Sequence, residues 1–468
     1  GFRLKRIQSD NSCCEIRESI HVNCPLHENG AQVFGYVSEI SKKQIPIFNE
    51  KFKGEIKFEQ GDIIGKSGLE GALEREIRGI DGISFLQVDA RGREAVTQTP
   101  DIFGQKIQDK EPIPGYNVTL TLDKDVQVAA FKSMTDNKRI GAVVAMQTNG
   151  EILAWVNTPS FDPNEFAVGI APEVWSKIIN DPYKPLRDKA IQDHTSPGST
   201  FKPIMAIAAL QEKVVTPNQV IYCPGAINFG KRLYHDHLKN GHGNITIYDA
   251  LERSSNVFFY KMGIGLGIEK MSAYAKAFGL GQKTGVEVDN EVAGLIPTPD
   301  WKKKEIGEEW QPGENLSTVI GQGFVLVSPI QLARAYNAIG NGGKLYKPFV
   351  VKKIVNHENV ILKEFSEKLT RDLSQANPDG VKIDSSTFDV VREGLRRVAN
   401  GERGTAKWWK IPGVQIAGKT GTSQVMSFSA DQIYSKCETN PMHMRHHGWF
   451  IGYAPAENPV ITVAVLAE

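Results

Sequence analysis

Hydrophobic residues alternate with polar ones, or form short uninterrupted runs, in several stretches of the chain. The strongest such signal is a pair of apolar runs, 141–146 and 151–156, joined by Thr148-Asn149-Gly150. An Asn-Gly pair favours the tight turn of a β-hairpin, so the two runs are predicted to pair. The same reasoning predicts further strands at 33–37, 83–88, 118–122, 414–418, 448–453 and 460–465.

Apolar residues spaced three and four apart predict helices between these strands. Asp123 is placed to cap a helix that continues to Met134. Other helices are predicted at 69–77, 203–210, 245–262, 268–278 and 388–398. The late strands are joined by turns, which favours antiparallel pairing. The predicted fold is therefore α+β, an antiparallel sheet with helices on both faces.

Composition and charge narrow the class of protein. The 468 residues are 40% apolar and 23% charged, values typical of a globular protein with two or three domains. A net charge of +1 gives no indication of binding to nucleic acid or to an anionic membrane surface. The run 112–115, Pro-Ile-Pro-Gly, predicts a boundary between domains at 1–115 and 116–468. The first domain gathers no catalytic residue types and is predicted to be structural.

The cysteines and the first residues leave questions open. The five cysteines are an odd number, so at least one is left without a partner in the chain; Cys13 or Cys14 could pair with Cys24. The cellular compartment does not follow from this count. Residues 1–6 are unlike a natural N-terminus, and we expect a further segment before them.

The candidate chemistry begins at Ser199 and Lys202. Pro197 and Gly198 predict a sharp bend, which places Ser199 at the start of an apolar helix. Lys202 lies three residues further on, so its ammonium returns over the same helix face. A desolvated lysine can take the proton of a serine hydroxyl and make it a nucleophile. By itself the spacing is also that of an ordinary serine cap with a solvated lysine.

Two more short motifs follow. Ser254-Ser255-Asn256 interrupts an apolar segment that is predicted to be helical, and its hydroxyl and carboxamide could join a network with Lys202. Lys419-Thr420-Gly421-Thr422 follows the predicted strand 414–418 and offers a cation and two hydroxyls to a carboxylate. Taken singly, each is more often a solvated helix surface or a polar strand end.

Together, the order S-x-x-K, S-D-N, K-T-G is the signature of penicillin-binding proteins and class A β-lactamases, and the chain has the three motifs in this order. The chain resembles the class B penicillin-binding proteins, above all the elongation-specific group called penicillin-binding protein 2. Ser255 stands where this signature has Asp. The resemblance extends to nearly the whole chain through segments at 34–37, 65–70, 158–164, 241–243, 321–323, 328–331 and 446–455.

This resemblance implies a peptidoglycan D,D-transpeptidase that cross-links stem peptides during cell elongation and is acylated by β-lactam antibiotics. It implies catalytic roles for Ser199, Lys202, Ser254, Asn256 and Lys419, and substrate binding by Thr420, Gly421 and Thr422. The backbone N–H groups of Ser199 and Thr422 would hold the oxyanion. A carboxypeptidase side activity would use the same site, and no cofactor is required.

The resemblance also implies a location and partners. Family members are held in the bacterial inner membrane by one N-terminal helix, which we expect in the segment before residue 1, with the catalytic domain in the periplasm. They act on a lipid-linked precursor and on stem pentapeptides, beside a SEDS-family glycan polymerase and a rod-shape scaffold protein. The first domain resembles the pedestal of these proteins.

A metal site is a further candidate. Cys223, Asp236 and His242 lie in one loop-rich stretch and are ligand types that zinc prefers. The resemblance implies zinc here as well, since some relatives of penicillin-binding protein 2 carry a zinc ion at the corresponding place. Ser255 is a poor fourth ligand, so water, His235 or His237 would complete a structural zinc site; the alternative is a polar loop without metal. A second cluster, His443, His446 and His447 near Cys437, is interpreted as an exposed loop.

Two other classes of protein share these motifs. A β-lactamase would need a glutamate that activates a deacylating water, and the sequence offers no clear candidate. A non-catalytic β-lactam sensor would keep the fold and acylate without turnover. A stable acyl-enzyme together with cross-linking of a pentapeptide donor would separate a transpeptidase from both.

Overall fold

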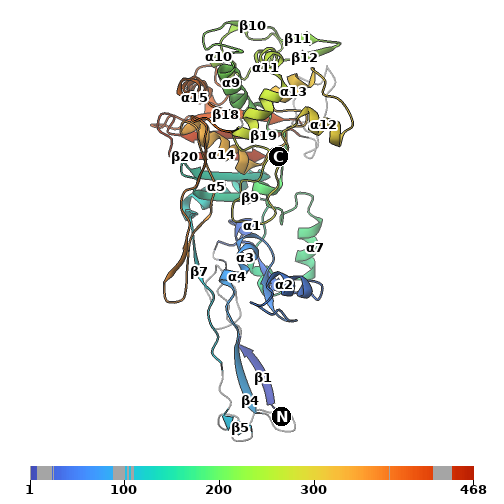
Figure 1. The fold of residues 1–468 in the computed structure, drawn as a ribbon, viewed down its shortest axis with the longest axis vertical. Helices are drawn as coiled ribbons and strands as arrows, with labels where there is room; N and C mark the ends of the chain where they lie inside the picture. Colours follow the sequence, from blue (N-terminus) through green and yellow to red (C-terminus); the bar gives the residue numbers. More distant parts are fainter. Residues whose placement is uncertain are drawn as a thin grey trace.

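The computed structural model describes residues 2–7, 24, 26–87, 101–102, 105–106, 110–378, 380–424 and 445–468. The molecule is elongated, with the N-terminal elements at one end and the larger C-terminal domain at the other (Figure 1). Cys13, Cys14, Val88, Cys437 and His443 lie outside the described residues. Among the described residues, the longest apolar helices fall short of what a bilayer crossing needs.

A five-stranded antiparallel sheet forms the centre of the large domain. Its strand order is β18-β19-β20-β8-β9. The strands are β8 (Gly141–Gln147), β9 (Ile152–Thr158), β18 (Ala417–Ser423), β19 (His447–Ala454) and β20 (Ile461–Ala467). The predicted hairpin is confirmed, since Val144 pairs with Trp155 across β8 and β9.

Helices cover both faces of this sheet, as predicted. Val143 and Val156 pack with Met134 of α5 (Lys124–Asp136), whose first turn is capped by Asp123 as expected. α15 (Ser385–Asn400) lies against β18. Val144 points to the other face, where α14 (Pro329–Gly340) contacts β8, β19 and β20. β8 is therefore buried on both faces, which explains its unbroken apolar run.

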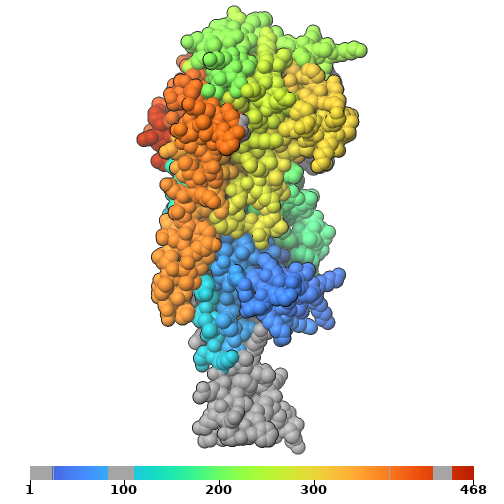
Figure 2. Space-filling model, viewed as in Figure 1, coloured from blue at the N-terminus to red at the C-terminus, as the bar shows by residue number. Residues whose placement is uncertain are grey.

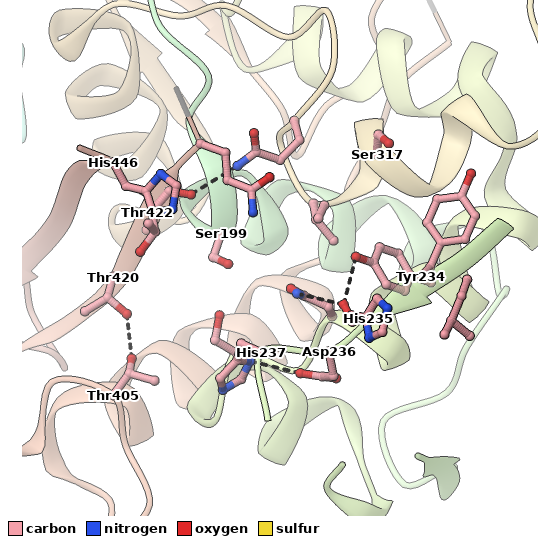
Figure 3. Close-up of a pocket in the computed structure, with 18 of the residues that line it drawn as sticks. Ser199, Tyr234, His235, Asp236, His237, Ser317, Thr405, Thr420, Thr422 and His446 are labelled. Carbon is pink, nitrogen blue, oxygen red and sulfur yellow. Dashed lines mark hydrogen bonds and ion pairs between the residues drawn. The ribbon is translucent and has the colours of Figure 1, made fainter. Parts of the chain in front are cut away.

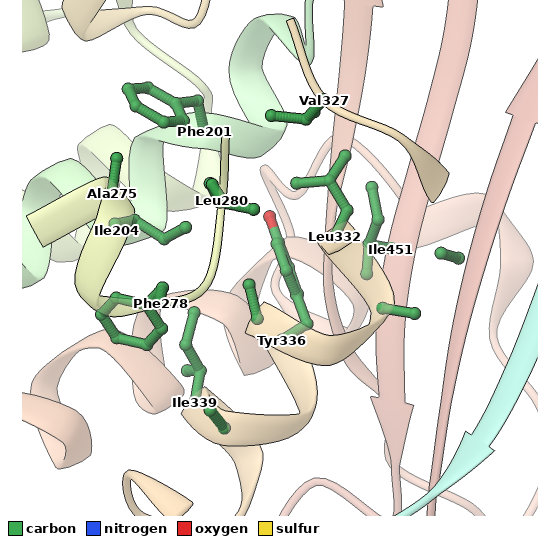
Figure 4. Packing of buried hydrophobic residues seen from close by; sticks show 14 of the residues in the cluster. Phe201, Ile204, Ala275, Phe278, Leu280, Val327, Leu332, Tyr336, Ile339 and Ile451 are labelled. Carbon is green, nitrogen blue, oxygen red and sulfur yellow. The ribbon is translucent and has the colours of Figure 1, made fainter. Parts of the chain in front are cut away.

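The central helix α9 (Lys202–Gln211) lies within this core, with nearly every residue buried. It packs against α11 (Asn256–Ala277) and α15. Figure 4 shows Tyr336 of α14 between the sheet residue Ile451 and the start of α9. The hydroxyl of Tyr336 donates to the carbonyl of Thr200 at 2.7 Å, so the sheet layer and the nucleophile turn are joined directly.

Shorter elements complete the large domain. They are β7 (Asn117–Leu120), α6 (Asn164–Ala167), α7 (Pro172–Asn180), α8 (Lys189–Gln192), η1 (Gly198–Phe201), β10 (Ile221–Cys223), β11 (Ala226–Phe229), β12 (Arg232–His235), β13 (Gly243–Ile245), α10 (Ile247–Glu252), α12 (Pro299–Glu305), α13 (Glu314–Val319), β14 (Lys344–Tyr346), β15 (Val351–Val355), β16 (Ile361–Glu364), β17 (Leu369–Asp372) and η2 (Lys407–Trp409). β7 pairs with β15 in a small separate sheet.

The N-terminal part consists of short helices and two-stranded sheets. Its elements are β1 (Phe2–Ile7), α1 (Ala31–Phe34), β2 (Val37–Glu39), α2 (Ile45–Lys51), β3 (Ile63–Gly65), α3 (Gly68–Ala72), α4 (Glu74–Ile77), β4 (Gly82–Gln87), β5 (Asp101–Ile102) and β6 (Gln105–Lys106). It contacts the segment after β9, where Tyr36 lies 4.2 Å from the ring of Phe166 and Gln32 donates to the carbonyl of Pro185 at 2.7 Å. Figure 2 shows the N-terminal part (blue) directly below the large domain.

Three predictions of local structure were wrong. Residues 31–34 form a helix rather than the first part of a strand, because Val33 packs into the main core with Leu69 and Leu73. The predicted helix 245–262 is broken into α10 and α11 at 253–255. The strand predicted at 414–418 begins only at Ala417 and continues through the K-T-G motif.

Candidate active site

The turn before Ser199 packs directly on strand β18. Gly198 has a φ of +54°, a conformation that favours glycine, and a Cβ there would lie 2.3 Å from the carbonyl oxygen of Thr422. From the other side, a Cβ on Gly421 would lie 2.8 Å from the carbonyl oxygen of Pro197. Because both positions are glycine, the backbone of the turn before Ser199 can contact the backbone of β18. Ser199 follows in the 3₁₀ turn that leads into α9.

Lys202 is fully buried beneath this turn. Its ammonium donates to the carbonyl of Ser254 and to Oδ1 of Asn256, both at 2.8 Å, and lies 3.3 Å from the Ser254 hydroxyl. Burial lowers the pKa of Lys202 to about 7, a shift that the negative charge of Asp236 partly opposes. A neutral amine is therefore accessible at this position near neutral pH.

Ser254 and Asn256 lie in the break between α10 and α11, not within one helix. Ser254 has a φ of +58°, and Ser255 caps α11 by accepting from the backbone N–H of Phe258. Serine and asparagine side chains compete for backbone hydrogen bonds and so favour such caps and turns. This break directs both the carbonyl and the hydroxyl of Ser254 at Lys202.

The third motif lies on β18 itself. Lys419 is buried, and its ammonium donates to the carbonyl of Thr420 at 3.1 Å. Burial and the neighbouring charge of Lys202 hold the pKa of Lys419 well below its usual range. The side chain of Gln322 donates to the carbonyl of Thr422 at 3.1 Å. This hydrogen bond fixes the C-terminal end of β18.

The three motifs meet at one pocket of about 470 Å³. Six of the predicted residues line it, namely Ser199, Ser254, Asn256, Thr420, Gly421 and Thr422, while Lys202 and Lys419 are buried below its surface. Figure 3 shows Ser199 in the middle of the pocket, with Thr420 and Thr422 on one side. The pocket can hold an acyl group on Ser199 next to two threonine hydroxyls.

Sequence reasoning missed Thr405. Its Oγ1 lies 2.6 Å from Oγ1 of Thr420, and both side chains line the pocket (Figure 3). Glu252 holds the loop in place, because its carbonyl accepts from the N–H of Thr405 and its carboxylate from that of Arg403. The only local signal is a Gly404-Thr405 pair, which is too common to have been singled out.

The candidate metal ligands only partly coincide with the predicted set. Asp236, His237 and His242 each offer one ligand atom, and these atoms all lie within 4.8 Å of one another. Cys223 lies outside this group, and its thiol on β10 donates to the carbonyl of Ile221 at 3.6 Å. His237, one of the three alternatives offered for the fourth position, stands in this group in place of Cys223.

This group also organises the start of α11. Oδ2 of Asp236 accepts from the Ser255 hydroxyl and from the N–H of Val257, at 2.8 and 2.9 Å. Burial acts to raise the pKa of Asp236, but hydrogen bonds with His237 and His242 outweigh it and lower the pKa. Nδ1 of His242 is buried without a hydrogen-bond partner among the described residues. One carboxylate and two imidazoles are ligands that suit zinc. The free Nδ1 of His242 leaves this group with one ring nitrogen whose hydrogen bonding the described residues do not satisfy.

Comparison with known proteins agrees with this geometry. The family model "Penicillin binding protein transpeptidase domain" matches residues 140–468, and "Penicillin-binding Protein dimerisation domain" matches residues 2–120. The chain belongs to the penicillin-binding protein transpeptidase family. The predicted fold class is confirmed with it, since this family's fold is the antiparallel sheet flanked by helices described above.

Individual relatives are similar over most of the chain. Peptidoglycan D,D-transpeptidase MrdA of Haemophilus influenzae is 32% identical, with 97% of this chain and 67% of the relative covered. A crystal structure of Pseudomonas aeruginosa PBP2 in complex with WCK 5153 is 30% identical with a TM-score of 0.75, covering 99% and 92% of the two chains. PBP2 of Helicobacter pylori, solved in complex with MreC, is 28% identical with a TM-score of 0.75, covering 95% and 75%.

Thr405 gives a test of the pocket of this penicillin-binding protein. The Thr405→Val variant loses the hydrogen bond that fixes the Thr420 hydroxyl, and we expect the second-order rate of acylation by penicillin to fall about three- to tenfold. Thr405→Ser keeps the hydroxyl and should stay close to the wild-type rate. Rates are measured with a fluorescent penicillin. Equal rates for Thr405→Val and wild type would contradict a role for this contact.

Proposed function

We propose that Ser199 is the nucleophile through which this protein, a peptidoglycan D,D-transpeptidase, forms its acyl-enzyme. The observation that carries this proposal is the meeting of the three motifs at one pocket, with a buried lysine of lowered pKa one helical turn from Ser199. Family membership supplies the reaction class, and the geometry supports the assignment of roles to individual residues.

In the first half-reaction, Oγ of Ser199 attacks the carbonyl carbon between the two D-alanines of a donor stem peptide. Neutral Lys202 takes the hydroxyl proton. The backbone N–H groups of Ser199 and Thr422 stabilise the oxyanion. The C–N bond then breaks, the leaving D-alanine amine receives a proton through the Ser254 hydroxyl, and the donor stays on Ser199 as an ester.

In the second half-reaction, the amine of another stem peptide attacks the ester carbon. A new amide C–N bond forms as the amine gives up a proton to neutral Lys202, the C–O bond to Ser199 breaks, and the serine oxygen takes that proton from the Lys202 ammonium. Water in place of the amine gives a carboxypeptidase product. A β-lactam imitates the D-Ala-D-Ala end and acylates the same serine.

The remaining motif residues bind and orient the donor. Thr420 and Thr422 donate hydroxyl hydrogen bonds to its terminal carboxylate, and Gly421 lets the donor backbone come close to β18. Asn256 positions the ammonium of Lys202. Burial is what favours the neutral base at Lys202, and burial together with the charge of Lys202 lowers the pKa of Lys419. The low pKa values of the two lysines support this assignment.

The location and partners are part of the proposal. We place the protein outside the cytoplasm, on the periplasmic side of the inner membrane, acting during cell elongation. A rod-shape scaffold protein is proposed as a partner on the evidence that Helicobacter PBP2 was solved with MreC. A SEDS-family glycan polymerase that supplies new strands from lipid-linked precursor is the second proposed partner.

The nucleophile is tested by labelling. A fluorescent penicillin should modify one tryptic peptide, the one that contains Ser199, and Ser199→Ala should abolish the label. Thr195→Ala is the matched control, because it removes a hydroxyl from the same segment without removing the nucleophile. A label on any other peptide would overturn the assignment.

The base is tested by the pH dependence of acylation. Below about pH 7 Lys202 is protonated and cannot accept the serine proton, so the acylation rate should rise about tenfold per pH unit up to about pH 7 and then level off. Lys202→Ala should lower the rate by about 10² to 10⁴ and remove this rise. A wild-type rate that does not change between pH 5 and 7 would assign the base elsewhere.

We also propose that Asp236, His237 and His242 hold a structural zinc ion. Bound there, the ion would supply a fixed positive charge that holds together the loop 236–242 after β12. Asp236 already bonds Ser255 and Val257, so the site would hold the turn that presents Ser254 and Asn256 to Lys202.

Metal content is the test of this site. Protein purified without chelator or affinity tag should contain about one zinc per chain, and its melting temperature should fall after chelation, because the metal binds the folded state. Asp236 also has protein partners, so His242→Ala is the variant to use. His357→Ala, on an exposed loop, is the control. A His242→Ala variant with unchanged zinc content would contradict the site.

A further inference from the structure

The wall of the pocket that faces the K-T-G strand has no role in the reaction described so far. It is formed by the β11–β12 hairpin together with α13. Figure 3 shows Tyr234 and Ser317 on the opposite side of Ser199 from Thr420 and Thr405. In Figure 1 the hairpin projects at the end of the large domain farthest from the N-terminus, and Figure 2 shows its tip standing free of the domain.

The hairpin is held at its base and carries a cation toward the pocket. The Tyr234 hydroxyl donates to the carbonyl of Gly313 at 3.1 Å, and its ring packs edge-on against Tyr260 of α11. The guanidinium of Arg232 lies 5.2 Å from the centre of the Tyr234 ring. Arg232 lines the pocket, is exposed, and makes no ion pair with any described residue.

The electrostatic balance of the pocket favours an anionic ligand on this side. Asp236 is the one acidic side chain among the described lining residues. Its oxygens already bond Ser255, Val257, His237 and His242. The charge of Arg232 is therefore not neutralised by its surroundings, and its fork of N–H groups is suited to a carboxylate.

The reaction itself needs a second peptide at this place. Once the donor is esterified to Ser199 and lies along β18, the attacking amine must approach from the side of the pocket that the donor leaves open. The hairpin wall is on that side. A second stem peptide ends in a carboxylate, as the donor does, so it carries the charge that Arg232 can bind.

We infer that Arg232, supported by Tyr234, binds a carboxylate of the acceptor stem peptide and thereby guides its amine to the acyl-enzyme. Arg232 is a substrate-binding residue for the second half-reaction and takes no part in proton transfer. This inference rests on the transpeptidase function proposed above. It adds the acceptor subsite, which the three motifs leave undefined.

The test measures how the acyl-enzyme divides between the two possible attackers. A thioester analogue of the donor is turned over by the full chain in the presence of a synthetic stem tetrapeptide that has a free side-chain amine. The amide product reports attack by the peptide, and the free acid reports attack by water. In Arg232→Gln the ratio of amide to acid should fall roughly tenfold, the loss expected for one charge-assisted hydrogen bond.

Two controls make the result specific. Lys231→Gln removes a charge one residue away that does not line the pocket, and its ratio should equal that of wild type. An acceptor peptide with all carboxylates converted to carboxamides should give the same low ratio with wild type and with Arg232→Gln. Arg232→Lys, which keeps the charge but not the fork, should recover part of the ratio.

Each other outcome overturns the inference. An unchanged ratio of amide to acid in Arg232→Gln excludes the subsite. An equal fall of this ratio in Lys231→Gln would mean that the effect of Arg232 is one of general charge and not of a specific contact. A fall that persists with the carboxamide acceptor excludes carboxylate binding. Failure of the transpeptidase function is seen separately, because wild type would then form no label on Ser199 and no amide with any acceptor.

Discussion

The burial of one ammonium group is the constraint on which the site depends. Lys202 has no access to solvent, so its N–H groups must be satisfied by protein, and they bond Ser254 and Asn256. These bonds join the start of α9 to the break between α10 and α11. The same burial lowers the pKa of Lys202 to about 7. One physical cause therefore fixes the position of the group and makes the neutral amine available.

Close backbone contact joins strand β18, which carries the third motif, to the turn that presents Ser199. Gly198 and Gly421 have no side chains where the nucleophile turn meets β18, and a methyl group at either position would collide with a carbonyl oxygen. Tyr336 bonds the carbonyl of Thr200 from below and ties this contact to α14 and the sheet. The catalytic geometry is thus rigid because it is part of the core. The chemistry needs this rigidity, since a proton transfer and an oxyanion contact both fail over small displacements.

The opposite wall of the pocket is built differently. The β11–β12 hairpin is held at its base by Tyr234, while Leu233 and Arg232 remain exposed. Asp236 and its two histidines lie at the junction between this hairpin and α11. A rigid donor side and a more open acceptor side fit a reaction in which one substrate is covalently held and the second must enter and leave.

The sequence alone indicated the family, the reaction class and the three motifs that carry the proposed chemistry. Three motifs in a fixed order identify the family, and local patterns predicted the β8–β9 hairpin, the Asp123 cap and the α15 helix, because each depends on residues close together in the chain. Only the tertiary structure decided the rest. Thr405 became a pocket residue by meeting Thr420, and His237 replaced Cys223 in the candidate metal group. Arg232 came to line the pocket because the hairpin faces β18 across it. These relations join segments that no local pattern connects, so they arise only when the chain packs.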